Sequence, residues 1–150
     1  MHYIAFMDDG NVTNALRVLQ AADEIKAGVS GEFSSIHGIS VNEFLLMRHL
    51  ESAPLHRLAR VDLAKRMHVN ASTITRMVVP MEKIGLLERQ AHDRDARLSF
   101  VALTATGRTR FGEAQATFAK QAGYVFGEDW SDAELESFAG MLLRIIGNRT

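Results

Sequence analysis

Hydrophobic residues recur at a spacing of three or four along most of the chain, which is the period of an amphipathic helix. The first such segment runs from about Asn11 to Ser34 and predicts a long helix. The tetrapeptide SVNE, Ser40 to Glu43, is a capping-box sequence, in which the Ser side chain caps the helix and the Glu reaches back to the Ser backbone. It predicts the start of a second helix, which stops near Pro54.

Two shorter helices are predicted next, separated by a tight turn. Arg60 to Met67 has helical periodicity, and the turn after it contains Asn70, a favourable N-cap residue. The fourth helix then covers Ala71 to Ile84. It ends at Gly85, because glycine readily takes the left-handed conformation that terminates helices.

The pattern changes to short strands after this glycine. LLERQ (86–90) and LSFVAL (98–103) are predicted as the strands of a hairpin, and the polar sequence AHDRDAR (91–97) joins them. Thr104 then opens a long helix. A second capping box, SDAE at Ser131 to Glu134, opens the last helix.

Helix, tight turn, helix and hairpin is the order of a winged helix-turn-helix, in which the second helix of the pair enters the DNA major groove. We therefore expect a mainly α fold with a small β-hairpin wing (α+β). At 100° per residue, the fourth helix has an apolar side and an opposite line formed by Ser72, Arg76, Val79 and Lys83. This line could read DNA, or it could be a solvated face whose hydroxyl residues only cap the helix.

Charge is unevenly distributed along the chain. The net charge is −1, yet residues 57–97 contain nine Lys and Arg against five Asp and Glu. The rest of the chain has eight basic and thirteen acidic residues. A local basic zone is what contact with phosphate requires, so the overall charge does not argue against a nucleic-acid partner.

Several classes of function lack their sequence signals. The chain has no Cys, which excludes disulfides and thiolate chemistry. It has no Gly-rich phosphate loop, no His-Glu-x-x-His motif and no nucleophile elbow, so we expect no enzymatic activity. The His residues do not show metal-ligand spacing. No apolar run is long enough to span a membrane and the start lacks a secretion signal, so we expect a cytoplasmic protein without a cofactor.

The segment from Asp62 to Arg108 resembles the MarR family of bacterial transcription regulators. The matching features are the LA…V…S…TR helix pair, the sequence EKIGLLER before the first strand, and a D-x-R loop followed by LTATG. The resemblance implies one MarR-type domain over residues 1–150. Its dimerisation helices would lie at about 11–36 and 104–148, and its winged-helix lobe at about 40–103.

The resemblance also implies a function. A homodimer would bind a palindromic operator in double-stranded DNA as a ligand-responsive repressor, with helix 71–84 in the major groove and the wing, residues 92–97, in the minor groove. Asp95 and Arg97 match the family's D-x-R signature; without a DNA role they would form only a hairpin salt bridge. The expected DNA contacts are Asn70, Ala71, Ser72, Thr73, Thr75, Arg76, Lys83, Arg94, Asp95 and Arg97.

Pro80 departs from the family pattern, because a polar or basic residue is common at this place in the recognition helix. Proline removes the hydrogen bond to the carbonyl of Arg76 and tends to kink a helix. We therefore expect DNA contact to be concentrated in the first turns, with Lys83 limited to a phosphate.

The family's effectors, often small aromatic or phenolic molecules, bind between the dimerisation helices and the DNA-binding lobe. The residues expected to line such a cleft are Phe33, His37, Phe44, Met47 and Arg48, although each could equally be an ordinary core or rim residue. The alternative to DNA binding is a winged helix used for protein–protein contact or assembly, which should display apolar residues where this helix displays Ser72 and Arg76. A compact monomer is the alternative to the dimer.

Overall fold

A computed structural model describes residues 10–92, 94–95 and 98–147. The first element of the described residues is helix α1 (Asn11–Glu32), which continues into a π-helical segment, η1 (Phe33–His37). The elements that follow are α2 (Val41–Glu51), the 3-10 turn η2 (Pro54–His56), β1 (Arg57–Ala59), α3 (Arg60–Met67), α4 (Ala71–Lys83), β2 (Leu87–Ala91), β3 (Ser99–Leu103), α5 (Ala105–Phe126) and α6 (Asp132–Ile146).

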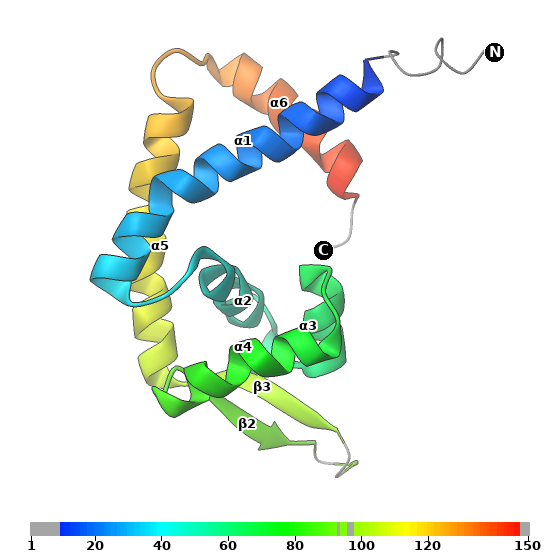
Figure 1. Cartoon of the computed structure of the whole chain (residues 1–150), viewed down its shortest axis with the longest axis vertical. Coiled ribbons are helices and arrows are strands. Elements are labelled where there is room, and N and C mark those ends of the chain that lie inside the picture. Colours follow the sequence, from blue (N-terminus) through cyan, green and yellow to red (C-terminus); the bar gives the residue numbers. More distant parts are fainter. Residues whose placement is uncertain (1–9, 93, 96–97, 148–150) are drawn as a thin grey trace, which may run out of the picture.

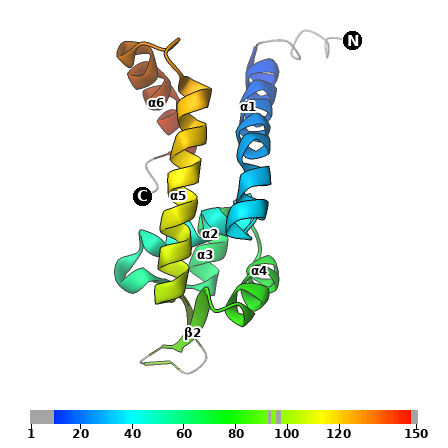
Figure 2. The same ribbon diagram turned by 90° about the vertical axis from the view of Figure 1, so that its left-hand side faces the viewer.

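The elements from α2 to β3 form a lobe at one end of the molecule (Figure 1). Helices α1 and α5 extend from this lobe and pack against each other along part of their length (Figure 2). Helix α6 lies at the far end, where Phe126, Trp130 and Phe138 form an aromatic cluster with ring centroids 5.6–5.8 Å apart. The expected mainly α fold with a β-hairpin is therefore confirmed.

A three-stranded antiparallel sheet closes the lobe, with strand order β1-β3-β2. Strands β2 and β3 form the predicted hairpin, in which Gln90 pairs with Phe100. Strand β1 was not predicted from the sequence; it is only three residues long and pairs Leu58 with Val101. Leu55 and His56 precede it with positive φ angles of 58° and 53°. These two non-glycine residues turn the chain sharply from α2 into the sheet. The sequence does not predict this turn, because non-glycine residues rarely take positive φ angles.

The hydrophobic core lies inside the lobe. Phe44 of α2 stacks on Phe111 of α5 with centroids 5.2 Å apart, and it contacts Phe33 at 4.9 Å. Val29 is the one residue of α1 that is buried, and α6 buries none. Most of α1 and all of α6 therefore lie outside the core of their own chain.

The predicted helix starts are confirmed at four places. Ser40 and Ser131 form complete capping boxes with Glu43 and Glu134. The hydrogen bonds from Ser131 lower the pKa of the Glu134 carboxyl. Asn70 and Thr104 cap α4 and α5 through their side-chain oxygens. The predicted end of the first helix was less accurate, because the α-helix stops at Glu32.

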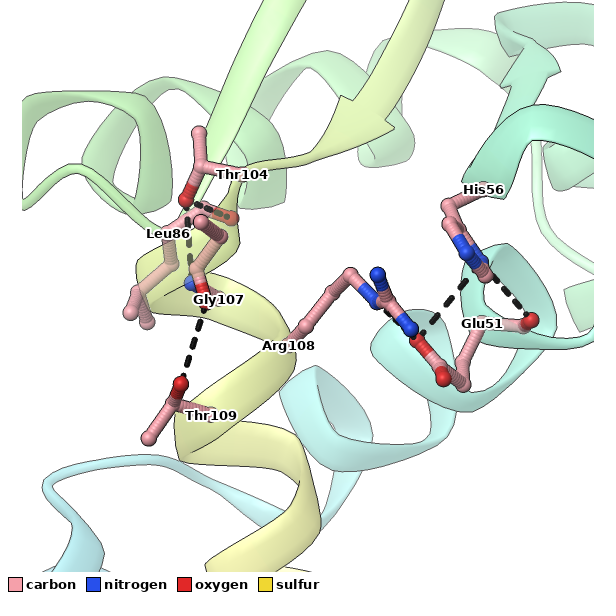
Figure 3. A network of polar contacts seen from close by, with 8 residues as sticks. Glu51, His56, Leu86, Thr104, Gly107, Arg108 and Thr109 are labelled. Atoms are coloured by element: carbon pink, nitrogen blue, oxygen red, sulfur yellow. Dashed lines mark hydrogen bonds and ion pairs between the residues drawn. The ribbon is translucent and has the colours of Figure 1, made fainter.

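Thr104 also fixes α5 to the turn that follows α4 (Figure 3). Its hydroxyl lies 2.6 Å from the carbonyl oxygen of Gly85 and 3.2 Å from that of Leu86, and it accepts the Gly107 N–H at 2.9 Å. A Cβ atom on Gly107 would lie 2.0 Å from the Leu86 oxygen. Glycine is therefore required in the LTATG sequence, because α5 touches the Leu86 backbone there.

A second polar contact holds the first turn of α5 to the end of α2 (Figure 3). Arg108 Nε lies 3.4 Å from Glu51 Oε2. His56 Nδ1 lies 3.1 Å from the Glu51 carbonyl oxygen and 3.7 Å from Oε2. The long helix α5 is therefore anchored to both sides of the lobe.

No helix within the described residues has the length and apolar character needed to cross a membrane. In that same part of the chain, no three acidic or His side chains gather in a way that could hold a metal ion.

Candidate nucleic-acid interface

Helix α4 has the two faces that its sequence predicts. Ile74, Val78 and Met81 are buried in the core, and Met77 packs against it. On the opposite side lie four exposed residues, which we call the α4 line: Ser72, Arg76, Val79 and Lys83. The amphipathic pattern therefore fixes which side of α4 faces the solvent.

A hydrogen-bond network organises the first turn of α4. Asn70 Oδ1 accepts the Thr73 backbone N–H at 2.8 Å and lies 2.7 and 2.9 Å from the hydroxyls of Ser72 and Thr73. Arg76 Nη2 donates to Thr73 Oγ1 at 3.3 Å. These contacts bring Asn70, Ala71, Ser72, Thr73 and Arg76 of the predicted site together at one helix end. Such an end also offers N–H groups and a positive dipole to a phosphate.

Thr75 has a different environment from the other hydroxyl residues. Its hydroxyl bonds to the Ala71 carbonyl oxygen at 3.1 Å, and it accepts an N–H from Arg60 Nη1 at 2.8 Å. Arg60 is the first residue of α3 and is half-buried. Arg60 could not be identified from the sequence, because a contact between residues fifteen positions apart leaves no local signal.

Pro80 does not end α4, which continues to Lys83. Beyond the proline, Ile84 N–H still donates to the Pro80 carbonyl oxygen at 3.3 Å. Lys83 lies about 16 Å from Ser72 along the axis, at 1.5 Å per residue. Lys83 is thus on the α4 line but far from the polar network at the first turn.

The hairpin carries the described part of the wing. Arg94 is exposed, and its backbone N–H donates to His92 Nδ1 at 3.1 Å. Asp95 is half-exposed, and its carbonyl oxygen accepts the Leu98 N–H at 3.0 Å. Arg97 and Asp93 lie outside the described residues. The structure therefore places Arg94 and Asp95 at the end of the hairpin.

The outer face of the sheet supports this wing through ring contacts. The His92 ring stacks on Phe100 with centroids 5.1 Å apart. The Arg57 guanidinium lies over the same Phe100 ring at 4.4 Å, and it donates to Gln90 Oε1 at 3.0 Å. A chain of contacts thus runs from β1, the strand that the sequence did not reveal, to the backbone of Arg94.

The surface of the lobe carries basic side chains that form no ion pair with a described carboxylate. Among the described residues, no carboxylate forms an ion pair with Arg60, Arg76 or Lys83. Burial and the nearby charges of Arg48, Arg66 and His68 lower the pKa of His49. The arrangement is suited to binding an anion.

The residues predicted to line an effector cleft do not lie on one surface. Phe33, Phe44 and Met47 are at most 2% exposed and belong to the core. His37 is also buried, with Nε2 2.7 Å from Thr117 Oγ1, and its carbonyl oxygen accepts from Arg110 Nη1 at 2.8 Å. Arg48 is exposed on α2. A ligand would have to part the core to reach the aromatic residues.

The α3–α4 pair, the hairpin and the third strand together define a winged helix-turn-helix lobe. Residues 39–99 match the family model of the MarR family. In the residues that form this lobe, the chain is therefore similar to the MarR family.

One relative is an HTH-type transcriptional repressor, YetL, of Bacillus subtilis, with 32% identity over 106 residues, or 70% of this chain. The chain spans 62% and 56% of the lengths of the two curated relatives that it matches.

Solved structures of the family share this fold. AbsC, a MarR family transcriptional regulator from Streptomyces coelicolor, is similar with a TM-score of 0.80 and 17% identity, covering 94% of this chain and 95% of that protein. A second MarR family regulator from the same organism, solved in complex with DNA, has a TM-score of 0.78 and 20% identity, with 89% and 83% covered. The expected winged-helix architecture is confirmed over nearly the whole chain.

Proposed function

We propose that this protein is a sequence-specific DNA-binding transcription regulator that acts as a homodimer. The observation that carries the proposal is the α4 line, which presents Ser72 and Arg76 beside a capped helix end while the opposite face is buried. An Arg in this position can donate two hydrogen bonds to guanine, and hydroxyl groups can bond to bases or phosphates. The contacts that we propose are those expected from the sequence except Thr75, whose hydroxyl is bonded within the protein, with Arg94, Asp95 and Arg97 at the minor groove.

The dimer is supported by apolar surface that the chain leaves uncovered. Helix α1 exposes Val12, Leu16 and Leu19 by 53–63%, and the end of α6 exposes Ile145 and Ile146 by 68% and 64%. An open hollow on α6 is lined by residues that include Trp130, Phe138 and Met141. We propose that α1, α5 and α6 pair with those of a second copy, which removes this surface from water. A two-fold dimer would place two recognition helices on half-sites about 34–36 Å apart.

Repression and ligand release complete the proposal. The Bacillus subtilis relative is described as a repressor, which supports that direction of regulation. We propose that an aromatic or phenolic effector acts between the dimerisation helices and the lobe, near Phe33, His37, Phe44, Met47 and Arg48, and that the core parts to admit it. The whole chain would function as one domain, without catalytic activity, in the bacterial cytoplasm.

The testing experiment is fluorescence anisotropy with the DNA upstream of the protein's own gene and with a scrambled duplex, at two salt concentrations. Tight binding to the first duplex with a steep salt dependence is the expected result. Equal binding to both duplexes would contradict sequence specificity. Absence of binding at low salt would favour the protein-contact alternative.

Two variants refine this test. Arg76→Ala should lose the difference between the two duplexes, whereas Lys120→Ala, an exposed change on α5, should keep it. Sedimentation should show a dimer at micromolar concentration, and Leu19→Asp should shift it toward monomer. A wild-type monomer at that concentration would contradict the proposed assembly.

A further inference from the structure

The hydroxyl of Thr75 is already engaged inside the protein. It donates to the Ala71 carbonyl oxygen and accepts an N–H from Arg60, at 3.1 and 2.8 Å. A Thr hydroxyl has one hydrogen to donate. Thr75 therefore has no donor left for a phosphate while these bonds persist, although its position on α4 suggests a DNA contact.

The contact with Thr75 restrains the Arg60 side chain and leaves most of its hydrogen-bond donors unused. Its guanidinium carries five N–H donors, of which the described structure uses one, on Thr75. No described carboxylate forms an ion pair with it. The bond to Thr75 restrains a long side chain beside the first turns of α4, so less conformational entropy is lost when its other donors bind an anion.

We propose that Arg60 is a DNA-contacting residue that binds a backbone phosphate, and that Thr75 acts by positioning it. The inference rests on the proposed DNA binding and adds a contact from α3, at the start of the helix pair. In this arrangement Arg76 is available for base edges, while Arg60 fixes the register of the lobe on the sugar-phosphate backbone. Phosphate contacts of this kind position a protein and do not themselves read sequence.

The test is a double-mutant cycle on DNA affinity, using Arg60→Ala, Thr75→Val and the double variant. Arg60→Ala should weaken binding about tenfold or more on specific and scrambled DNA alike, because a charge-assisted bond is lost. It should also reduce the salt slope by about 0.9, the value for one phosphate. Thr75→Val should weaken binding in the wild-type background but have no further effect in the Arg60→Ala background.

Matched variants separate this role from a purely structural one. Arg66→Ala removes the same charge from an exposed position on α3 and should change affinity much less. Thr75→Ser keeps the hydroxyl and should retain the affinity, and Arg60→Lys should retain the salt slope. Urea denaturation of each variant shows whether affinity changes merely follow loss of folded protein.

Three results would overturn the inference. Thr75→Val could weaken binding equally in both backgrounds, which would make Thr75 a direct DNA contact. Arg60→Ala could instead match Arg66→Ala in affinity and salt slope, which would leave Arg60 as only a tie between α3 and α4. Loss of all wild-type binding at low salt would refute the proposed function itself, and this outcome is visible before any variant is made.

Discussion

Replacing Gly107 with Ala should destabilise the protein strongly, although alanine is the better helix former. The new Cβ would lie 2.0 Å from the Leu86 carbonyl oxygen, whereas carbon–oxygen contacts are ordinarily at least about 3.3 Å. The start of α5 and the Leu86 backbone must therefore separate by more than about 1 Å. The Thr104 hydroxyl cannot then keep its contacts with Gly85 and Leu86.

The magnitude follows from three contributions. Overpacking at a rigid contact costs about 1–3 kcal/mol. Loss of the hydrogen bond from the Thr104 hydroxyl to Gly85 and of the one from the Thr104 backbone N–H to the Leu86 carbonyl oxygen adds about 1 kcal/mol each. The higher helix propensity of alanine relative to glycine offsets about 1 kcal/mol of this loss. The expected loss in the free energy of unfolding is therefore about 2–4 kcal/mol.

The assay is urea denaturation at a fixed protein concentration, with Gly112→Ala as the matched control. Gly112 lies in the same helix, and a Cβ added there meets nothing within 4 Å. That variant should be as stable as the wild type or gain up to about 1 kcal/mol. If both variants unfold at the same urea concentration, the close approach of α5 to Leu86 is not a constraint on stability.

Three further changes should act at the cap of α4, at the wing and at the half-buried His49 of α2. Asn70→Ala removes three contacts at the start of α4 and should cost about 1 kcal/mol of stability, whereas Asn70→Asp should not. His92→Asn keeps an acceptor for the Arg94 N–H, whereas His92→Phe keeps the ring on Phe100. If the backbone shape of the wing contributes to DNA affinity, the Asn variant should bind DNA more tightly than the Phe variant. Burial lowers the pKa of His49 below its value in the unfolded chain, 6.5, so the unfolded state takes up more protons as the pH falls. The free energy of unfolding should therefore decrease below about pH 6.5, and it should decrease less in His49→Leu. Equal pH profiles for the two proteins would contradict this.

Local signals made the helix starts and the faces of α4 predictable from the sequence. A cap is a contact over three residues, so Ser40, Asn70 and Thr104 could be identified without a structure. The hairpin was predicted because two short segments, LLERQ and LSFVAL, flank a polar loop. Each of these features depends on residues that are near one another in the chain.

Features that depend on distant residues were missed. Strand β1 is too short to show a period, and it exists because Leu58 pairs with Val101. The Arg60–Thr75 contact and the ring stack on Phe100 join separate elements in the same way. Helix α4 continues past Pro80 to Lys83, as predicted from the sequence, with its apolar side packed on the core. Tertiary packing outweighs local propensity there.

The uncovered apolar surface of α1 has a consequence for the amount of protein in a cell. A single copy exposes Leu16 and Leu19 on α1, and this helix is buried in the core of its own chain only at Val29. If assembly covers this helix, unpaired copies are the ones most open to proteolysis, and degradation removes them continuously. Survival of the protein would then rise steeply with its concentration. The lifetime of each copy would depend on how many others are present.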